Sequence, residues 1–192
     1  IASIGYQASI VITPQQEADI DIKATLNNLL IPYTSNYAGT LLPGIREYTV
    51  TPGEKTTTIS GKGKAGLKQE ENYYFFYLPV CYKGITGKSY AYYNTSRSKN
   101  LYLPASVDEN YSYDIQLPEN LTLCTPIQEK KIDNPIGSFK ITLTSEGSSL
   151  HIELALQIKK QLITPAEYPA FRSLITEWTD RTRKPILFKT VQ

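Results

Sequence analysis

The stretch from Ser149 to Phe188 constrains the fold more than any other part of the sequence. Between Leu150 and Ile158 every second side chain is apolar, and polar residues such as His151 lie between them. This alternation is the period of a β-strand that buries one face. We therefore predict a strand here with one face in the core and one face in water.

A capped helix is predicted directly after this strand, over residues 164–181. Thr164 and Glu167 have the spacing of a capping box, with Pro165 at the first helical position. The apolar face of the helix would consist of Phe171, Leu174, Ile175 and Trp178. Pro169 lies beyond the first turn, where its ring would remove a hydrogen bond, so regular helix is expected only from this residue onward.

Short strands are predicted on both sides of the helix. After it, Pro185 ends the helical pattern, and residues 186–188 can return to a sheet edge. Before it, the pattern predicts two hairpins, which are Tyr6–Ile12 with Ala18–Leu26 and Ile45–Val50 with Thr56–Lys62. The run Tyr73–Leu78 is apolar without alternation, which predicts a central strand covered on both faces.

The spacing of these strands indicates the fold class. Short strands separated by Pro and Gly turns at intervals of about 8 to 12 residues are typical of an antiparallel sandwich. We predict an all-β fold, mainly an antiparallel β-sandwich, with one C-terminal α-helix packed on it. Residues 1–55 would form a hairpin region within the same sandwich or a linker subunit, and residues 56–192 the sandwich domain that carries the helix.

Charge and hydropathy exclude two classes of protein. The net charge of +2 argues against a nucleic-acid-binding protein, because such proteins neutralise many phosphates with basic side chains. No apolar run approaches the roughly 20 residues of a membrane-spanning helix, so no transmembrane segment is expected. The sequence contains no Met, and we interpret it as a processed or excised piece of a longer protein.

Neither a catalytic centre, a metal site nor a cofactor is predicted. Cys81 and Cys124 lie in strand-like stretches, where a disulfide or two separate buried thiols would fit, and separate thiols are the simpler interpretation. His151 is the only histidine, so a zinc site lacks ligands, and a Cys-His hydrolase would need a thiol within its reach. Residues 61–66 match G-x-G-x-x-G, but no helix follows, and we interpret them as a β-β loop.

Tyrosine is the unusual residue of this composition, with 15 in the chain. Its ring combines apolar area with a hydroxyl, so an exposed cluster suits contact with a protein or a glycan. In β-sandwiches most tyrosines instead pack across strands. The cluster near a polar loop is the candidate binding surface, and its residues are Tyr82, Tyr90, Tyr92, Tyr93 and Arg97.

Several segments follow one another in an order found in a known family. They are residues 73–79 (YYFFYLP), 96–98 (SRS), 101–103 (LYL), 111–119, 134–139 (NPIGSF) and 163–188 with the centre EYPAFR. In this order they resemble the C-terminal domain of unknown function of bacterial transglutaminase-like proteins, a group that includes suspected cysteine proteases. The resemblance runs from about Thr56 to the end, and no residue matches the Cys, His and Asp of the family's catalytic core.

The resemblance implies a non-catalytic accessory domain, because in that family a papain-like catalytic core precedes this domain. The implied partner is the transglutaminase-like catalytic domain of the same parent chain, on which the domain would pack or beside which it would present a binding surface. The family's setting implies the periplasm or cell surface of a Gram-negative bacterium. The alternative is an independent glycan- or protein-binding module with a tyrosine-rich surface.

Overall fold

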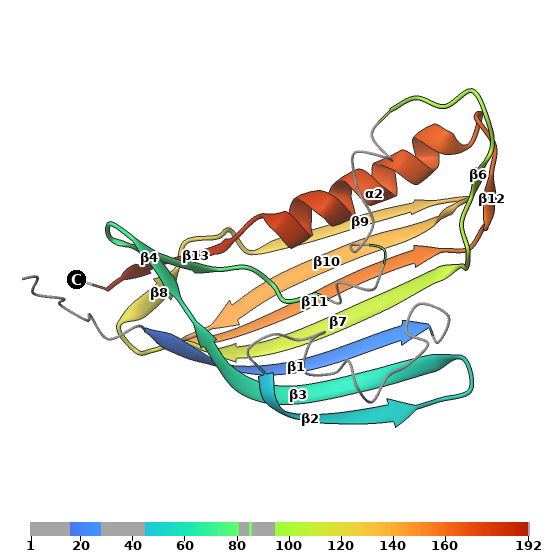
Figure 1. Cartoon of the computed structure of the whole chain (residues 1–192). Coiled ribbons are helices and arrows are strands. Elements are labelled where there is room, and N and C mark those ends of the chain that lie inside the picture. The colour runs from blue at the N-terminus through green and yellow to red at the C-terminus, as the bar shows by residue number, and fades with distance from the viewer. Residues whose placement is uncertain (1–15, 28–44, 81–84, 86–94, 192) are drawn as a thin grey trace, which may run out of the picture.

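The structure is a computed structural model that describes residues 16–27, 45–80, 85 and 95–191. Over these ranges it consists mainly of antiparallel β-sheets, with one α-helix near the C-terminus (Figure 1). The predicted fold class is therefore confirmed. No helix within the described ranges is long and apolar enough to cross a membrane.

The largest layer is a seven-stranded sheet in the order β2-β3-β1-β7-β11-β10-β9, and every neighbouring pair is antiparallel. Its strands are β1 (Glu17–Asn27), β2 (Ile45–Pro52), β3 (Thr56–Gly66), β7 (Val107–Gln116), β9 (Gln128–Asn134), β10 (Gly137–Glu146) and β11 (Ser149–Ile158). Strand β11 alternates between buried and more exposed side chains, as predicted. Gly147, with φ of 58°, turns the chain tightly from β10 into β11.

Strand β1 has a neighbour on each side, β3 and β7. The predicted hairpin over Ile45–Val50 and Thr56–Lys62 is confirmed by β2 and β3. The other predicted hairpin needed Tyr6–Ile12 beside Ala18–Leu26, and Tyr6–Ile12 lies outside the described residues. The prediction of a loop at residues 61–66 is wrong, because these residues continue β3 and pair with β1.

Helix α2 (Tyr168–Arg183) lies over β10 and β11 of the large sheet (Figure 1). It buries the predicted apolar face, and the side chains that are at most 1% exposed are Phe171, Leu174, Ile175 and Trp178. The Trp178 ring packs against Tyr111 of β7, with 6.0 Å between ring centroids. Burial of these rings between helix and sheet forms the centre of the core.

The helix begins at Tyr168, four residues later than the predicted range of 164–181. Pro169 therefore lies in the first turn of α2. The first backbone N–H groups of a helix have no partner within it, so proline at this position removes no hydrogen bond. The expectation of regular helix only from about Pro169 onward is confirmed.

Two smaller sheets lie at opposite ends of α2 (Figure 1). A four-stranded sheet, in the order β4-β5-β13-β8, lies beyond its C-terminal end and contains β4 (Lys68–Glu70), β5 (Tyr73–Phe76), β8 (Leu121–Leu123) and β13 (Ile186–Thr190). A two-stranded sheet of β6 (Leu101–Tyr102) and β12 (Leu162–Ile163) lies near its N-terminal end. Buried Leu67 joins β3 of the large sheet to β4 of the four-stranded sheet.

The four-stranded sheet corrects two predictions. Strand β13 is an interior strand, not a sheet edge, because β5 and β8 pair with its two sides. Strand β5 was predicted to be covered on both faces, yet only one face is buried, where Phe76 stacks on Phe188 with ring centroids 5.8 Å apart. On the other face Tyr73 is 49% exposed. Tyrosine tolerates such a position because its hydroxyl can meet water while its ring remains apolar.

Candidate functional site

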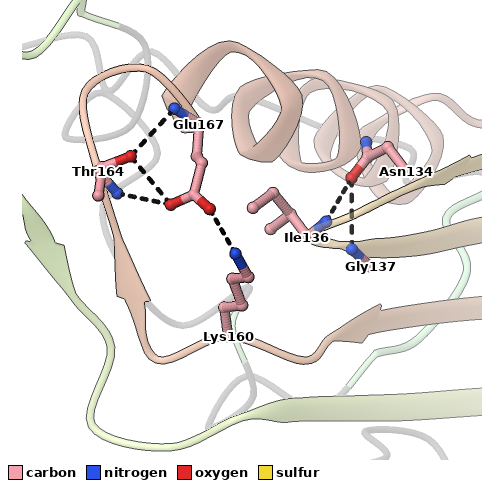
Figure 2. Close-up of polar contacts among 6 residues, drawn as sticks. All are labelled: Asn134, Ile136, Gly137, Lys160, Thr164 and Glu167. Carbon is pink, nitrogen blue, oxygen red and sulfur yellow. Dashed lines mark hydrogen bonds and ion pairs between the residues drawn. The ribbon is translucent and has the colours of Figure 1, made fainter.

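Reciprocal hydrogen bonds between Thr164 and Glu167 close the turn that leads into α2 (Figure 2). The Glu167 carboxylate accepts hydrogen bonds from the backbone N–H and the hydroxyl of Thr164, both at 3.0 Å, and the Glu167 N–H donates to Thr164 Oγ1 at 3.4 Å. Lys160 also donates to Glu167, and this bond, together with those from Thr164, lowers the pKa of the Glu167 carboxyl to about 2. The reciprocal bonds between Thr164 and Glu167 predicted from the sequence therefore exist, but they lie in the turn before the helix. The N-cap of α2 is Glu167, without a side-chain cap hydrogen bond, so the predicted helix start at Thr164 and Pro165 is wrong.

Asn134 joins the turn between β9 and β10 to the same end of the helix. Its Oδ1 accepts hydrogen bonds from the N–H groups of Ile136 at 2.9 Å and Gly137 at 3.3 Å (Figure 2). Its Nδ2 donates to the Ala170 carbonyl at 3.1 Å. Residues 134–139 and 163–188, two of the segments that carry the resemblance, are thus in contact at the first turn of α2.

Arg97, one of the predicted binding residues, lies against this first turn. Its guanidinium carbon is 5.6 Å from the centroid of the Tyr168 ring, which is the distance of a cation-π contact. The Arg97 side chain is half-buried, and Tyr168 is only 3% exposed. Residues 96–98, a third segment of the resemblance, therefore join the other two at this place.

These elements border a hollow of about 490 Å³, which we call the Arg97 pocket. Arg97 and Arg172 are the two cations among its lining residues, and Pro165 and Pro169 contribute apolar wall. Glu177 is its carboxylate, and the Lys130 ammonium is 2.5 Å from Glu177 Oε1. The pocket is therefore cationic on one part of its wall and apolar on another.

A second candidate surface is the outer face of the four-stranded sheet, which we call the aromatic face. It consists of Tyr73, Phe75 and Tyr77 from the β5 segment and Leu187 from β13, which lies opposite Phe75. The rings of Phe75 and Tyr77 meet edge to face, with centroids 6.1 Å apart. Tyr73, Tyr77 and Leu187 are 49%, 46% and 38% exposed. Aromatic side chains gathered in the open are typical of an interaction surface.

Charged groups flank the aromatic face. Lys68 of β4 lies opposite Phe75, and its ammonium is 5.8 Å from the centroid of the Tyr77 ring. Lys189 of β13 lies opposite Tyr73. A hollow of about 520 Å³ borders Tyr73 and Lys189, with exposed Val191 on its wall. The surface thus has an apolar centre and a charged margin, as protein interfaces have.

The outer face of the seven-stranded sheet carries ion pairs around His151. Nδ1 of His151 is 2.6 Å from Asp114 Oδ1, and Nε2 is 3.9 Å from Glu153 Oε1. A hydrogen bond from Lys140 at 3.0 Å lowers the pKa of the Glu153 carboxyl. His151 therefore belongs to a solvated surface, as predicted. Among the described residues, no group of three His, Cys, Asp or Glu side chains could hold a metal ion.

Glu109 is a buried carboxyl that the sequence analysis missed. It is 0% exposed, and it accepts hydrogen bonds from the Ile85 N–H at 2.5 Å and the Tyr111 hydroxyl at 3.1 Å. Burial raises the pKa of Glu109 to about 7, against the opposing effect of the two hydrogen bonds. The same burial, with the nearby charge of Glu109, raises the pKa of Tyr113 well above its ordinary value. Perturbed groups of this kind are worth testing for an effect of pH.

The comparison with protein families identifies the second part of the chain. Residues 72–188, more than half of the 192 residues, match the family described as "Domain of Unknown Function with solved-structure structure (DUF3858)". The chain belongs to the DUF3858 family. The matched DUF3858 range runs from the residue before β5 to Phe188 in β13, so it contains both the aromatic face and the Arg97 pocket.

A solved structure related to this DUF3858 chain is described as a putative protease from Parabacteroides distasonis. The two chains superpose with a TM-score of 0.56 and are 32% identical, and the match covers 62% of this chain and 24% of the protease chain. The DUF3858 chain thus spans about a quarter of that protein's length. The comparison with curated proteins found no match.

Of the five binding residues predicted in this DUF3858 chain, the structure places Arg97 in a pocket. The other four, Tyr82, Tyr90, Tyr92 and Tyr93, lie outside the described residues. Cys124 is a free, half-buried thiol, and Cys81 lies outside the described residues. The partners that the structure gives for His151 are the carboxylates of Asp114 and Glu153.

Three features of the candidate surfaces were present in the sequence but not used. Tyr73, Phe75 and Tyr77 occupy alternate positions of the run predicted as one strand, Tyr73–Leu78, and so would share a face. Arg172 follows Tyr168 by four residues, which places the two on the same side of a helix. Glu109 shares its strand face with apolar residues 107, 111, 113 and 115, and this placement signals a buried carboxyl.

Proposed function

We propose that this DUF3858 domain is a non-catalytic accessory domain of a larger transglutaminase-like protein with a protease-type core. In this proposal it docks on the catalytic domain of its own parent chain through the aromatic face. The observation that carries the proposal is that Tyr73, Tyr77 and Leu187, which surround Phe75 at the outer face of a hydrogen-bonded sheet, are open to solvent.

The aromatic face suits a permanent partner for physical reasons. Covering its side chains removes apolar area from water, which contributes about 25 cal/mol for each Å². Both strands that supply them, β5 and β13, have hydrogen-bonded neighbours on each side, so little ordering is needed on binding. Lys68 and Lys189 at the margin favour acidic groups on the partner, which would set the orientation of docking.

The comparison with the protein from P. distasonis that is described as a putative protease supports the accessory role. The chain matches only 24% of that protein, so most of the related protein consists of other parts. We assign no catalytic residue to this domain, and in our proposal the chemistry belongs to the remainder of the parent. The proposed location is the periplasm or the surface of a Gram-negative bacterium.

The test measures binding between this chain and the transglutaminase-like catalytic segment of its parent, produced separately. We expect a dissociation constant in the micromolar range or tighter by isothermal titration calorimetry. The double variant Tyr73→Ser with Leu187→Ser should weaken binding at least tenfold, because central apolar residues of an interface contribute about 1 to 2 kcal/mol or more each. Trp178 fluorescence and urea denaturation would show that each variant is folded.

A matched control lies at the other end of the helix. Tyr102 and Leu162 form a cross-strand pair between β6 and β12, and they are 73% and 40% exposed. Tyr102→Ser with Leu162→Ser removes the same two side-chain types and should leave the affinity unchanged. Equal losses in both double variants, or no binding by the folded chain, would refute docking through the aromatic face. The absence of binding would favour an independent glycan- or protein-binding module, to be tested on glycan arrays.

A further inference from the structure

We propose that the Arg97 pocket binds a peptide segment through its carboxylate groups. This inference does not rest on the docking proposal, because it concerns a different surface. The pocket borders α2 from Tyr168 to Glu177. The aromatic face belongs to the four-stranded sheet, which lies beyond the C-terminal end of the helix (Figure 1).

The two guanidinium groups are the first part of the argument. Tyr168 holds Arg97 by a cation-π contact at 5.6 Å, so part of the ordering cost of Arg97 is met before a ligand arrives. Arg172 lies one helical turn after Tyr168 and is exposed, and it has no carboxylate within ion-pair distance among the described residues. Guanidinium groups bind carboxylates with two parallel hydrogen bonds, which gives both strength and orientation.

The carboxylate already in the pocket does not block a ligand. Glu177 is bound by the Lys130 ammonium at 2.5 Å, so this pair balances its own charge. Arg97 and Arg172 therefore make the remaining lining positively charged. A ligand carboxylate would meet net attraction at the guanidinium side of the pocket and a neutral pair at the other.

The apolar wall decides which kind of anion fits. Pro165, Pro169 and Tyr168 line the same hollow of about 490 Å³, which is large enough for an amino-acid side chain with adjoining backbone. A small inorganic anion would leave this wall wet. A nucleic acid would need a wide basic surface, and the chain has a net charge of only +2. A peptide with both carboxylate and apolar side chains can contact the guanidinium groups and the apolar wall at the same time.

The probe is an N-acetylated, C-amidated pentapeptide of alternating glutamate and leucine, titrated into the complete 192-residue chain at low salt. Its twin contains glutamine in place of glutamate. We expect calorimetry to show that the glutamate peptide binds at least tenfold more tightly than the glutamine twin. A second twin contains glutamine and a free C-terminus, so it tests a terminal carboxylate separately from side-chain carboxylates. The proposal is supported if the glutamate peptide or this second twin binds more tightly than the C-amidated glutamine twin.

Two variants and one control locate the site. Arg172→Gln should weaken binding about tenfold, and Arg97→Lys, which keeps the charge but loses the planar fork, should weaken it severalfold. Lys159→Gln makes the same charge change at an exposed residue outside the pocket and should have no such effect. The proposal is overturned if no carboxylate peptide binds or if the C-amidated glutamine twin binds equally well. It is also overturned if Lys159→Gln weakens peptide binding as much as Arg172→Gln does, or if inorganic phosphate at equal concentration displaces the peptide.

Discussion

Replacing Glu109 with glutamine should stabilise the protein at alkaline pH and leave its stability unchanged at acidic pH. Glu109 is fully buried on β7, where the Ile85 N–H and the Tyr111 hydroxyl donate to its carboxyl. Glutamine has nearly the same shape and keeps an acceptor oxygen, but it never ionises. The variant therefore isolates the cost of a buried negative charge from the loss of packing.

The magnitude follows from the pKa of the carboxyl. Burial raises the pKa of Glu109 from 4.5 to about 7, and each unit corresponds to 1.36 kcal/mol. Because the pKa of Glu109 is raised in the folded state, folding takes up a proton at pH values between 4.5 and about 7. The stability that the neutral carboxyl provides is complete below pH 4.5 and is lost as the pH rises through 7. The full loss in the wild-type protein is on the order of 3 kcal/mol.

The assay is urea denaturation of both proteins at pH 4.5, 6 and 8, followed by the fluorescence of Trp178, the single tryptophan. The free energy of unfolding of Glu109→Gln minus that of the wild type should be near zero at pH 4.5 and reach about 3 kcal/mol at pH 8. Glu153→Gln is the control. Lys140 lowers the pKa of this exposed carboxyl, so its removal should have the opposite sign and cost at most about 1 kcal/mol. A difference for Glu109→Gln that does not change with pH would refute the reasoning.

Three other substitutions test the fold. Thr164→Ala should lower the free energy of unfolding by about 1 kcal/mol, because Glu167 loses its hydrogen bonds with the Thr164 hydroxyl in the turn before α2, and an unchanged urea midpoint would contradict this role. Gly137→Ala would place a Cβ 1.9 Å from the Gln157 carbonyl oxygen and should cost about 1–3 kcal/mol or more, whereas a melting temperature equal to that of the wild type would exclude the clash. Trp178→Ala should cost roughly 3–5 kcal/mol, measured by circular dichroism, and a loss below 1 kcal/mol would show that the core closes around the gap.

The parts of the fold that depend on neighbouring residues could be predicted from the sequence. Strand β11 has strict alternation, and the turn before α2 is closed by two residues three positions apart, Thr164 and Glu167. The hairpin of β2 and β3 required only a Pro-Gly turn between alternating stretches. Each of these features places its physical cause within a few residues of its effect.

The four-stranded sheet could not be predicted in the same way. Its strands come from residues 68–70, 73–76, 121–123 and 186–190, so its pairings join segments far apart in the chain. A strand of three to five residues carries little pattern of its own, and no local signal showed that β13 has two neighbours. The aromatic run of β5 also concealed its two faces, because tyrosine suits both a core and a wet surface.

The candidate sites also divide into features set by neighbouring residues and features that join distant segments. Arg97 was selected from its place in a polar stretch near clustered tyrosines, but its neighbours Tyr168 and Arg172 come from a helix about 70 residues later. The pocket exists only because the turn at Asn134, the helix start and residues 96–98 meet in space. Glu109 is different, since its inward position on an alternating strand was readable from the sequence alone.

Helix α2 keeps the two proposed surfaces apart, and this separation has a consequence for function. The Arg97 pocket borders α2 from Tyr168 to Glu177, whereas the aromatic face belongs to the four-stranded sheet beyond the C-terminal end of the helix. The two surfaces share no residue, and sites without shared partners should respond independently to substitution. Arg172→Gln should therefore leave docking unchanged, and Tyr73→Ser with Leu187→Ser should leave peptide binding unchanged. If both hold, a catalytic domain and a peptide can occupy the domain together, which is the physical requirement for presenting a peptide to a docked enzyme.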